Sequence, residues 1–351
     1  MVSPAPKVSV VMAVYNERPY LGTAVQSILD QTFEDFEFLI VNDGSTDGSK
    51  KVLEEFGQSD DRIRLVHQEN QGLIASLNRG LGMARGKYVA RMDGDDISHP
   101  ERFGRQVQFL NDSPEVGIVG TQANKIDAKG NLRVDWKRSL PTDPDVVIWR
   151  LLFNVCFCHP TVMMRRSVLE DLGGYAEWAV GAEDYELFTR AVLNTRLVNL
   201  PETLLEHRRH ENSVSVKNRE EYTQKCIQAA TPLHRAILGT SVDERITGFL
   251  VLMERKTLGT AVEETGVRDY TRVHKYLRSL YEKCADRYFR DGSNVQVLRR
   301  VLRRLDSIAN QITKEDGLIK GTFYKFRLWS VVTRGDIFPL LSTVLRPKIF
   351  R

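Results

Sequence analysis

The chain has 351 residues, of which 42% are hydrophobic and 27% are charged, and its formal net charge is +4. This composition is typical of a soluble globular protein and excludes a disordered chain. Its four cysteines are too few and too scattered to form a disulfide framework or a four-thiolate zinc site.

The first half of the chain alternates between strand and helix signals. Lys7 to Val14 is nearly all apolar and rich in β-branched residues, as in a strand buried on both faces of a parallel sheet. Apolar residues then recur at helical spacing from Arg18 to Gln31. The alternation continues with predicted strands at 36–41, 62–67 and 87–92 and predicted helices at 49–56 and 73–85. This order favours parallel strands joined by right-handed crossovers.

Polar residues follow the predicted strands, where ligands bind in open parallel sheets. They are Tyr15, Asp43, the stretch 68–71 and the tetrad Asp93-Gly94-Asp95-Asp96. The three crowded carboxylates of the tetrad repel one another, and a divalent cation that carries anionic oxygens would relieve this repulsion. The tetrad therefore predicts a metal-held phosphate ligand, and the alternative is a solvated turn.

The second half is less regular. We expect a hairpin turn at 127–131, a helix at 143–153, a strand at 161–164, an amphipathic helix at 183–193 and a short strand at 204–210. Beyond this point strand signals fade, and the stretches 222–238 and 295–312 have helical periodicity. We therefore predict a catalytic domain at 1–215 and a mainly helical C-terminal region at 216–351.

The basic excess of the chain lies at its end. Residues 317–351 contain seven basic residues and one acidic residue, interleaved with aromatic side chains. This pattern favours peripheral attachment to an anionic membrane surface, and the alternative is packing of the aromatics in the protein core. No stretch has the roughly twenty apolar residues of a spanning helix, and no secretory signal is visible, so we expect a cytoplasmic location, including the inner face of the cell membrane.

Seven motifs occur in an order that resembles a known family. They are VSVVMAVYNE at 8–17, VNDGSTDGS at 41–49, NQGLIASLNRGL at 70–81, ARMDGDDI at 90–97, HPTVMMRRSVLEDLGGY at 159–175, AEDYEL at 182–187 and HRRHENSVS at 207–215. Together they resemble the inverting family-2 glycosyltransferases, especially bacterial enzymes that build surface polysaccharides. The resemblance covers about residues 7–216.

The resemblance implies a GT-A fold, a Rossmann-like and mostly parallel sheet flanked by helices, and transfer of a sugar from a nucleotide-sugar. A UDP- or dTDP-sugar is favoured, and the acceptor is a hydroxyl of a glycan or lipid-linked molecule. The implied donor-binding residues are Ala13, Tyr15, Glu17, Asp43, Asn78, Arg79, Asp93 and Gly94. Mn²⁺ or Mg²⁺ would be held by Asp95, Asp93 and His210.

Three of these assignments have alternatives in the residues themselves. Asp43 could instead form an Asx-turn or cap the helix that follows it. The family often has an arginine before the asparagine of its third motif, but this chain has Leu77 there and Arg79 after Asn78. Either Asn78 or Arg79 could be a residue of the helix surface without a ligand.

The family places its catalytic base at the second acid of the pair Glu183-Asp184. Asp184 would accept the proton of the acceptor hydroxyl as that oxygen attacks the anomeric carbon, with inversion of configuration. A helix N-terminus stabilises the anion and weakens this base, whereas nearby negative charge and burial strengthen it. The alternative, an acidic first turn that stabilises its own helix, suits Glu183 better than Asp184.

Two rival functions share parts of this pattern. A sugar-1-phosphate nucleotidyltransferase would have the same sheet and metal, but it should carry a Gly-rich basic loop where this chain has Tyr15-Asn16-Glu17. A non-catalytic nucleotide-binding scaffold would have no use for both Asp95 and Asp184. Nucleic acid is not an expected partner, because neither an RNA-binding motif nor a basic face across the main domain is present. The sequence carries no signal of an oligomeric state.

Overall fold

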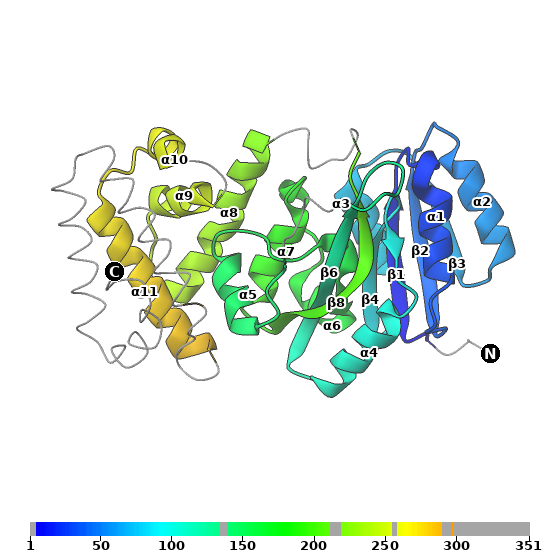
Figure 1. The fold of residues 1–351 in the computed structure, drawn as a ribbon, viewed down its shortest axis with the longest axis horizontal. Helices are drawn as coiled ribbons and strands as arrows, with labels where there is room; N and C mark the ends of the chain where they lie inside the picture. Colours follow the sequence, from blue (N-terminus) through cyan, green and yellow to red (C-terminus); the bar gives the residue numbers. More distant parts are fainter. Residues whose placement is uncertain (1–4, 134–138, 211–218, 255–257, 290–296, 298–351) are drawn as a thin grey trace. The chain divides into compact units, whose positions relative to one another are not determined.

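The computed structural model describes residues 5–133, 139–210, 219–254, 258–289 and 297. The chain divides into two compact units, Met1–Leu233 and His234–Arg351, each of which is described by itself (Figure 1). The domain boundary expected after residue 215 falls in the stretch 211–218, outside the described residues. It stays a prediction.

The first unit begins with the predicted alternation of strands and helices. The elements are β1 (Val8–Val14), α1 (Arg18–Leu29), β2 (Phe36–Asp43), α2 (Ser49–Ser59), β3 (Ile63–Gln68), α3 (Leu73–Met83) and β4 (Tyr88–Asp93). Every residue of β1 and β2 is buried. Helices cover both faces of these strands, which explains their unbroken apolar sequence.

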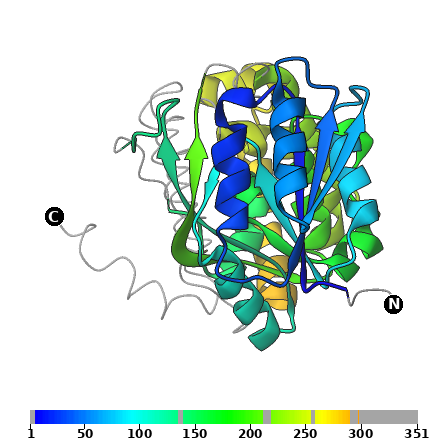
Figure 2. The same cartoon turned by 90° about the vertical axis from the view of Figure 1, so that its right-hand side faces the viewer.

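The first unit contains one mixed sheet of eight strands, in the order β3-β2-β1-β4-β7-β6-β8-β5. The pairs among β3, β2, β1 and β4 are parallel. From β1 the chain adds β2 and then β3 on one side of β1, and it then returns to place β4 on the other side of β1. Right-handed crossovers therefore put α1 and α2 on one face and α3 on the other, as Figures 1 and 2 show.

The far half of the sheet is where the structure adds most to the sequence-based prediction. The additional elements are β5 (Ile97–Ser98), α4 (Arg102–Asp112), β6 (Val116–Ile126), α6 (Arg166–Leu172) and the short helices η1 (His159–Thr161) and η2 (Glu177–Ala179). The predicted strand near 161 is β7 (Met163–Arg165), and it runs antiparallel to both β4 and β6. The continuous run of parallel neighbouring strands that the first half predicts thus ends at β4.

The last strand, β8 (Arg196–Arg208), is longer than predicted. It was expected only from Leu204, because Pro201 and Glu202 interrupt its apolar pattern. The strand passes these exposed residues with irregular register against β6, to which it is parallel.

The other predicted elements of this part of the chain are α5 (Pro144–Leu151) and α7 (Glu183–Ala191), both close to their predicted bounds. The predicted turn at 127–131 is confirmed by the antiparallel bridge between Ile126 and Leu132.

The C-terminal region is helical where it is described. Its helices are α8 (Arg219–Leu238), which contains residues of both units, α9 (Glu244–Met253), α10 (Leu258–Thr265) and α11 (Tyr270–Tyr288). In the second unit, His234 Nδ1 lies 3.0 Å from Tyr276 Oη and 3.3 Å from Thr247 Oγ1, a buried polar contact among α8, α9 and α11. The predicted helix at 295–312 and the basic tail at 317–351 lie outside the described residues, apart from Val297. Among the described helices, none has the length and apolarity needed to cross a membrane.

Candidate active site

The parallel strands bring their carboxyl ends, and the loops that follow, to one edge of the sheet. Ala13 of β1 lies beside Val41 of β2 and beside Asp93, the last residue of β4. The loop after β1, which contains Tyr15 and Glu17, therefore lies next to the acidic tetrad. This is the edge at which the sequence placed a ligand.

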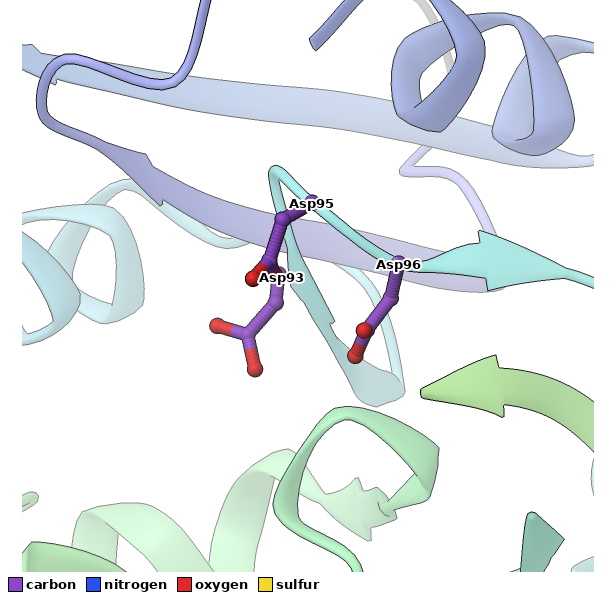
Figure 3. A group of neighbouring side chains, drawn as sticks. All are labelled: Asp93, Asp95 and Asp96. Atoms are coloured by element: carbon purple, nitrogen blue, oxygen red, sulfur yellow. The ribbon is translucent and has the colours of Figure 1, made fainter. Parts of the chain in front are cut away.

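The carboxylates of the tetrad come together. Asp93, Asp95 and Asp96 each offer an oxygen atom, and these atoms lie within 4.8 Å of one another. Figure 3 shows the carboxylates of Asp93 and Asp95 side by side, with that of Asp96 close to them. Oxygen ligands at this spacing suit a hard divalent cation such as Mg²⁺ or Mn²⁺.

The electrostatics of the cluster also fit a cation. Burial and the charge of Asp93 raise the pKa of Asp95, and burial with the charges of Asp93 and Asp95 raises the pKa of Asp96 well above its usual range. Asp96 Oδ2 is buried and has no hydrogen-bond partner in the described structure. The cluster thus holds more negative charge than its protein surroundings neutralise.

Glu17 joins this acidic cluster from the loop after β1. Burial, followed by the charges of Asp95 and Asp93, raises the pKa of Glu17 well above its usual range. A Cβ atom at position 94 would lie 1.8 Å from Glu17 Oε2, so any other residue there would displace this carboxylate from its position. Gly94 thus acts here by making room for Glu17, and its predicted contact with the donor remains untested.

Arg208, the last residue of β8, and His210, two residues beyond it, contact the acidic turn formed by Asp93–Asp96. His210 Nε2 lies 3.0 Å from Asp95 Oδ2. The main-chain N–H of Arg208 donates to Asp96 Oδ1 at 2.7 Å, and its guanidinium donates to the carbonyls of Asp95 and Asp127. Sequence reasoning selected His210 but missed Arg208, because a basic residue within a basic motif gives no sign of the carbonyls it contacts.

Tyr15 is the exposed aromatic side chain of the predicted nucleotide site. It is 50% exposed, which leaves its ring available for stacking on a flat heterocycle. The next residue, Asn16, has a positive φ of 55° and its Oδ1 accepts a hydrogen bond from the main-chain N–H of Thr46. This hydrogen bond ties the loop after β1, which contains Tyr15, to the loop after β2.

Asp43 is buried and contacts the loop after β3. Its Oδ1 accepts hydrogen bonds from Gln68 Nε2 at 2.7 Å and from the N–H of Gln71 at 2.8 Å, and its Oδ2 accepts one from the N–H of Gly72 at 2.8 Å. The role that the alternative gave to Asp43, at the start of the next helix, is taken by Asp47. Its Oδ1 accepts a hydrogen bond from the N–H of Ser49, the first residue of α2. The predicted contact of Asp43 with a nucleobase stays a prediction.

Asn78 and Arg79 have protein partners on different sides of α3. The amide of Asn78 donates to the carbonyl of Tyr175 and accepts from its N–H, at 2.8 and 2.9 Å. Arg79 is exposed, and its guanidinium donates to Gln68 Oε1 at 2.7 Å. The structure thus assigns Asn78 to fixing the Tyr175 segment, whereas contact of either residue with a diphosphate stays a prediction.

Asp184 lies in the first turn of α7, half-buried beside the buried Glu183. Burial and the charge of Asp184 raise the pKa of Glu183 to about 7. Glu183 Oε1 lies 3.9 Å from His159 Nδ1, and His159 Nε2 lies 2.8 Å from Tyr175 Oη. Burial also lowers the pKa of His159 well below its usual value, so its imidazole is neutral near pH 7.

The charges of the tetrad Asp93–Asp96 and of the acids in the first turn of α7 act on the same two side chains, Cys158 and Tyr175. Burial raises the pKa of the Cys158 thiol well above its usual range, and the charges of Asp96, Asp93 and Asp184 raise it further. Tyr175 likewise experiences the charges of both Asp184 and Asp93. Residues 93–96 and 183–184 therefore flank one region of the first unit.

A family model for glycosyl transferase family 2 matches residues 9–173. The putative glycosyltransferase EpsE of Bacillus subtilis is 34% identical over 275 residues, which cover 72% of this chain and 97% of that protein. The O-antigen biosynthesis glycosyltransferase WbnJ of Escherichia coli is 32% identical over 210 residues, which cover 59% of this chain and 81% of that protein.

Among solved structures, the chain resembles S. aureus TarS 1–349 in complex with UDP-GlcNAc, with a TM-score of 0.57. The match covers 92% of each chain at 17% sequence identity. At this identity the likeness concerns the fold alone, a mixed sheet flanked by helices.

Proposed function

Because this chain belongs to glycosyl transferase family 2, we propose that it transfers a sugar from a nucleotide-sugar to a hydroxyl group of a glycan or lipid-linked acceptor. The observation that supports the proposal most is that the charges of the acidic tetrad and of Asp184 act on the same two side chains, Cys158 and Tyr175. A UDP- or dTDP-sugar is the favoured donor, with Tyr15 stacked on its base. Similarity to WbnJ supports a role in polysaccharide, lipopolysaccharide or glycolipid synthesis.

On the donor side, Asp95 and Asp93 would hold Mn²⁺ or Mg²⁺, with His210 beside Asp95. When bound, such a cation would act as a Lewis acid and stabilise the negative charge that forms on the leaving diphosphate. The chain's own contribution is to keep the carboxylates converged, through the hydrogen bonds of Arg208 to Asp95 and Asp96. These contacts hold the site in shape before the donor arrives.

On the acceptor side, Asp184 would take the proton of the attacking hydroxyl. A carboxylate opposite the leaving group activates the acceptor oxygen for attack on the far face of the anomeric carbon, so the configuration inverts. The neighbouring Glu183 lies in the same first turn of the helix, and burial together with the charge of Asp184 raises the pKa of Glu183 to about 7.

The test compares Asp184→Asn with the wild type in release of nucleoside diphosphate from UDP-, dTDP- and GDP-sugars, with and without Mn²⁺, over a panel of acceptors. General-base catalysis contributes roughly 10²- to 10⁴-fold, so we expect turnover to fall by that factor while donor binding persists. Glu177→Gln, which removes an exposed acid ahead of the same helix, is the matched control and should keep wild-type activity.

Three outcomes would contradict parts of this proposal. Wild-type turnover by Asp184→Asn would remove Asp184 as the base. Formation of pyrophosphate and a nucleotide-sugar, when the protein is given a nucleoside triphosphate and a sugar 1-phosphate, would indicate a nucleotidyltransferase. Nucleotide-sugar binding without turnover on any acceptor would indicate a scaffold protein.

We further propose that residues 317–351 attach the protein reversibly to the inner face of the cell membrane, where lipid-linked acceptors are accessible. The proposal rests on the composition of this segment, which lies outside the described residues. Its basic residues would contact anionic headgroups, and its aromatic side chains would enter the interface.

A further inference from the structure

A buried arginine lies on β4, two residues before Asp93 of the acidic cluster. Arg91, on β4, is 3% exposed, and its guanidinium forms an ion pair with Asp93 through Nη1. Its main chain is fixed as well, since its N–H donates to the carbonyl of Val162 at 2.9 Å. Arg91 Nε is buried without a hydrogen-bond partner in the described structure. A charged side chain is costly to bury unless an opposite charge compensates it, and here Asp93 supplies that charge.

The charge of Arg91 reaches acids on three different segments. Burial raises the pKa of Glu17, Asp96 and Glu183, and the charges of neighbouring carboxylates raise it further. The positive charge of Arg91 lowers the pKa of each of these three acids. These residues belong to the loop after β1, the turn after β4 and the start of α7. Arg91 is thus a cation shared by the acids of the site.

A second buried arginine has a different type of partner. Arg102, at the start of α4, is fully buried, and its guanidinium donates to the carbonyls of Pro160 and Arg91. Its contacts fix main chain, and among the described residues no hydrogen bond or ion pair joins it to a carboxylate. The ion pair with Asp93 is therefore particular to Arg91 rather than a general property of buried arginines at this edge of the sheet.

We propose that Arg91 is the resident counter-ion of the acidic cluster, which neutralises Asp93 in the absence of a divalent cation and weakens cation binding until a donor diphosphate is present. The inference rests on the proposed function, because it takes Asp93 and Asp95 as the cation ligands. Arg91 acts through Asp93 and is a positioning residue.

The physical argument is competition for one carboxylate. A divalent cation on Asp93 and Asp95 is repelled by the fixed positive charge of Arg91, and it must also take over the Asp93 oxygen that the guanidinium contacts. The diphosphate of a donor adds negative charge to the same place and offsets this repulsion. Cation affinity should therefore depend strongly on the nucleotide.

The experiment measures Mn²⁺ binding to the full chain by titration calorimetry and by the electron paramagnetic resonance signal of free Mn²⁺, without nucleotide and with UDP. Arg91→Met removes the charge and retains a long apolar side chain. We expect it to bind Mn²⁺ about tenfold more tightly or better than the wild type without nucleotide, and by a smaller factor with UDP.

Two further variants separate charge from packing. Arg91→Lys keeps the positive charge and should bind Mn²⁺ like the wild type. Arg165→Met removes an arginine of β7 whose guanidinium donates to the carbonyls of Leu110, Ser113 and Val116, and it should leave Mn²⁺ affinity unchanged. If Arg91→Met folds poorly, its melting temperature should rise with added Mn²⁺ by more than that of the wild type.

Equal or weaker Mn²⁺ binding by Arg91→Met overturns the inference, as does a destabilised Arg91→Met whose melting temperature is insensitive to Mn²⁺. If neither protein binds Mn²⁺, with or without UDP, both the inference and the proposed cation site are wrong. If the wild type binds Mn²⁺ and Arg91→Met does not bind it more tightly, the cation site stands and only the role of Arg91 is lost.

Discussion

Glu183 is a carboxyl group whose ionisation the folded protein resists. Its pKa is about 7, against an ordinary value of 4.5, first because it is buried and second because Asp184 is negatively charged. The other charged or titratable groups around it are His159, Tyr175, Arg91 and Asp93. The folded protein therefore holds a proton on Glu183 more tightly than the unfolded chain does.

This property predicts a pH-dependent loss of stability. The contribution of Glu183 to the unfolding free energy is full below about pH 4.5 and is lost as the pH rises through about 7. In Glu183→Gln this loss is absent, so the unfolding free energy should fall less between pH 5 and pH 8 than in the wild type, by roughly 2 kcal/mol. Denaturant unfolding of both proteins at the two pH values measures the difference.

The exposed Glu177 supplies the control for this measurement. Glu177→Gln should follow the pH dependence of the wild type. If Glu183→Gln does so as well, Glu183 is ionised in the folded protein at neutral pH and the burial argument is wrong.

At the scale of elements, one carboxylate joins the starts of two helices. Asp47 Oδ2 accepts from the N–H of Arg18, the first residue of α1, at 2.9 Å. Asp47 Oδ1 accepts from the N–H of Ser49, the first residue of α2, at 2.9 Å and from its hydroxyl at 2.7 Å. The N-terminal N–H groups of a helix lack intrahelical partners, so Asp47 caps α1 and α2 together and fixes the loops beside Tyr15.

We therefore expect Asp47→Ala to affect both stability and donor binding. Loss of a capping side chain costs about 0.5 to 2 kcal/mol per helix, so the unfolding free energy should fall by roughly 1 to 4 kcal/mol. The Michaelis constant for the donor should rise several-fold with little change in kcat, because the loop that presents Tyr15 loosens. Denaturant unfolding and steady-state kinetics measure the two effects.

Asp61→Ala is the matched control, since Asp61 is an exposed acid just before β3. It should leave both quantities near the wild-type values. An Asp47→Ala protein with unchanged stability and an unchanged Michaelis constant would falsify the double-cap argument.

At the scale of the whole molecule, the charge is unevenly distributed. The chain has a net charge of +4, yet residues 317–351 alone carry seven basic residues against one acidic residue. The rest of the chain is therefore close to neutral and slightly acidic. Attraction to an anionic surface would come from one end of the chain, and salt would weaken it.

Liposome flotation tests the membrane proposal. The full chain should float with vesicles that contain anionic lipids at low ionic strength, and it should be released by added salt or from vesicles of neutral lipid. A chain that ends at residue 316 should stay in the soluble fraction under all these conditions. Equal flotation of the two chains would remove the proposed role of the tail.

The sequence by itself determined the strands and helices from β1 to β4 and the acids at their carboxyl ends. It could do so because the apolar periodicity of each element is a local property, and because parallel strands with short connections bring their carboxyl ends to one edge. The GT-A fold implied by the family resemblance, and the helical C-terminal region expected from the periodicity, are confirmed. The motif order likewise sufficed to identify the glycosyltransferase family.

Only the tertiary structure decided which side chains meet. The carboxylate of Glu17 lies against Gly94, which comes 77 residues later in the sequence. The main-chain N–H of Arg208 donates to Asp96 across 112 residues, and Asn78 is hydrogen-bonded to Tyr175 across 97 residues. The antiparallel strand β7 and the long β8 likewise depend on partners distant in the chain. Such contacts leave no local pattern, because a buried charge or amide is stabilised by whichever partner the fold brings to it.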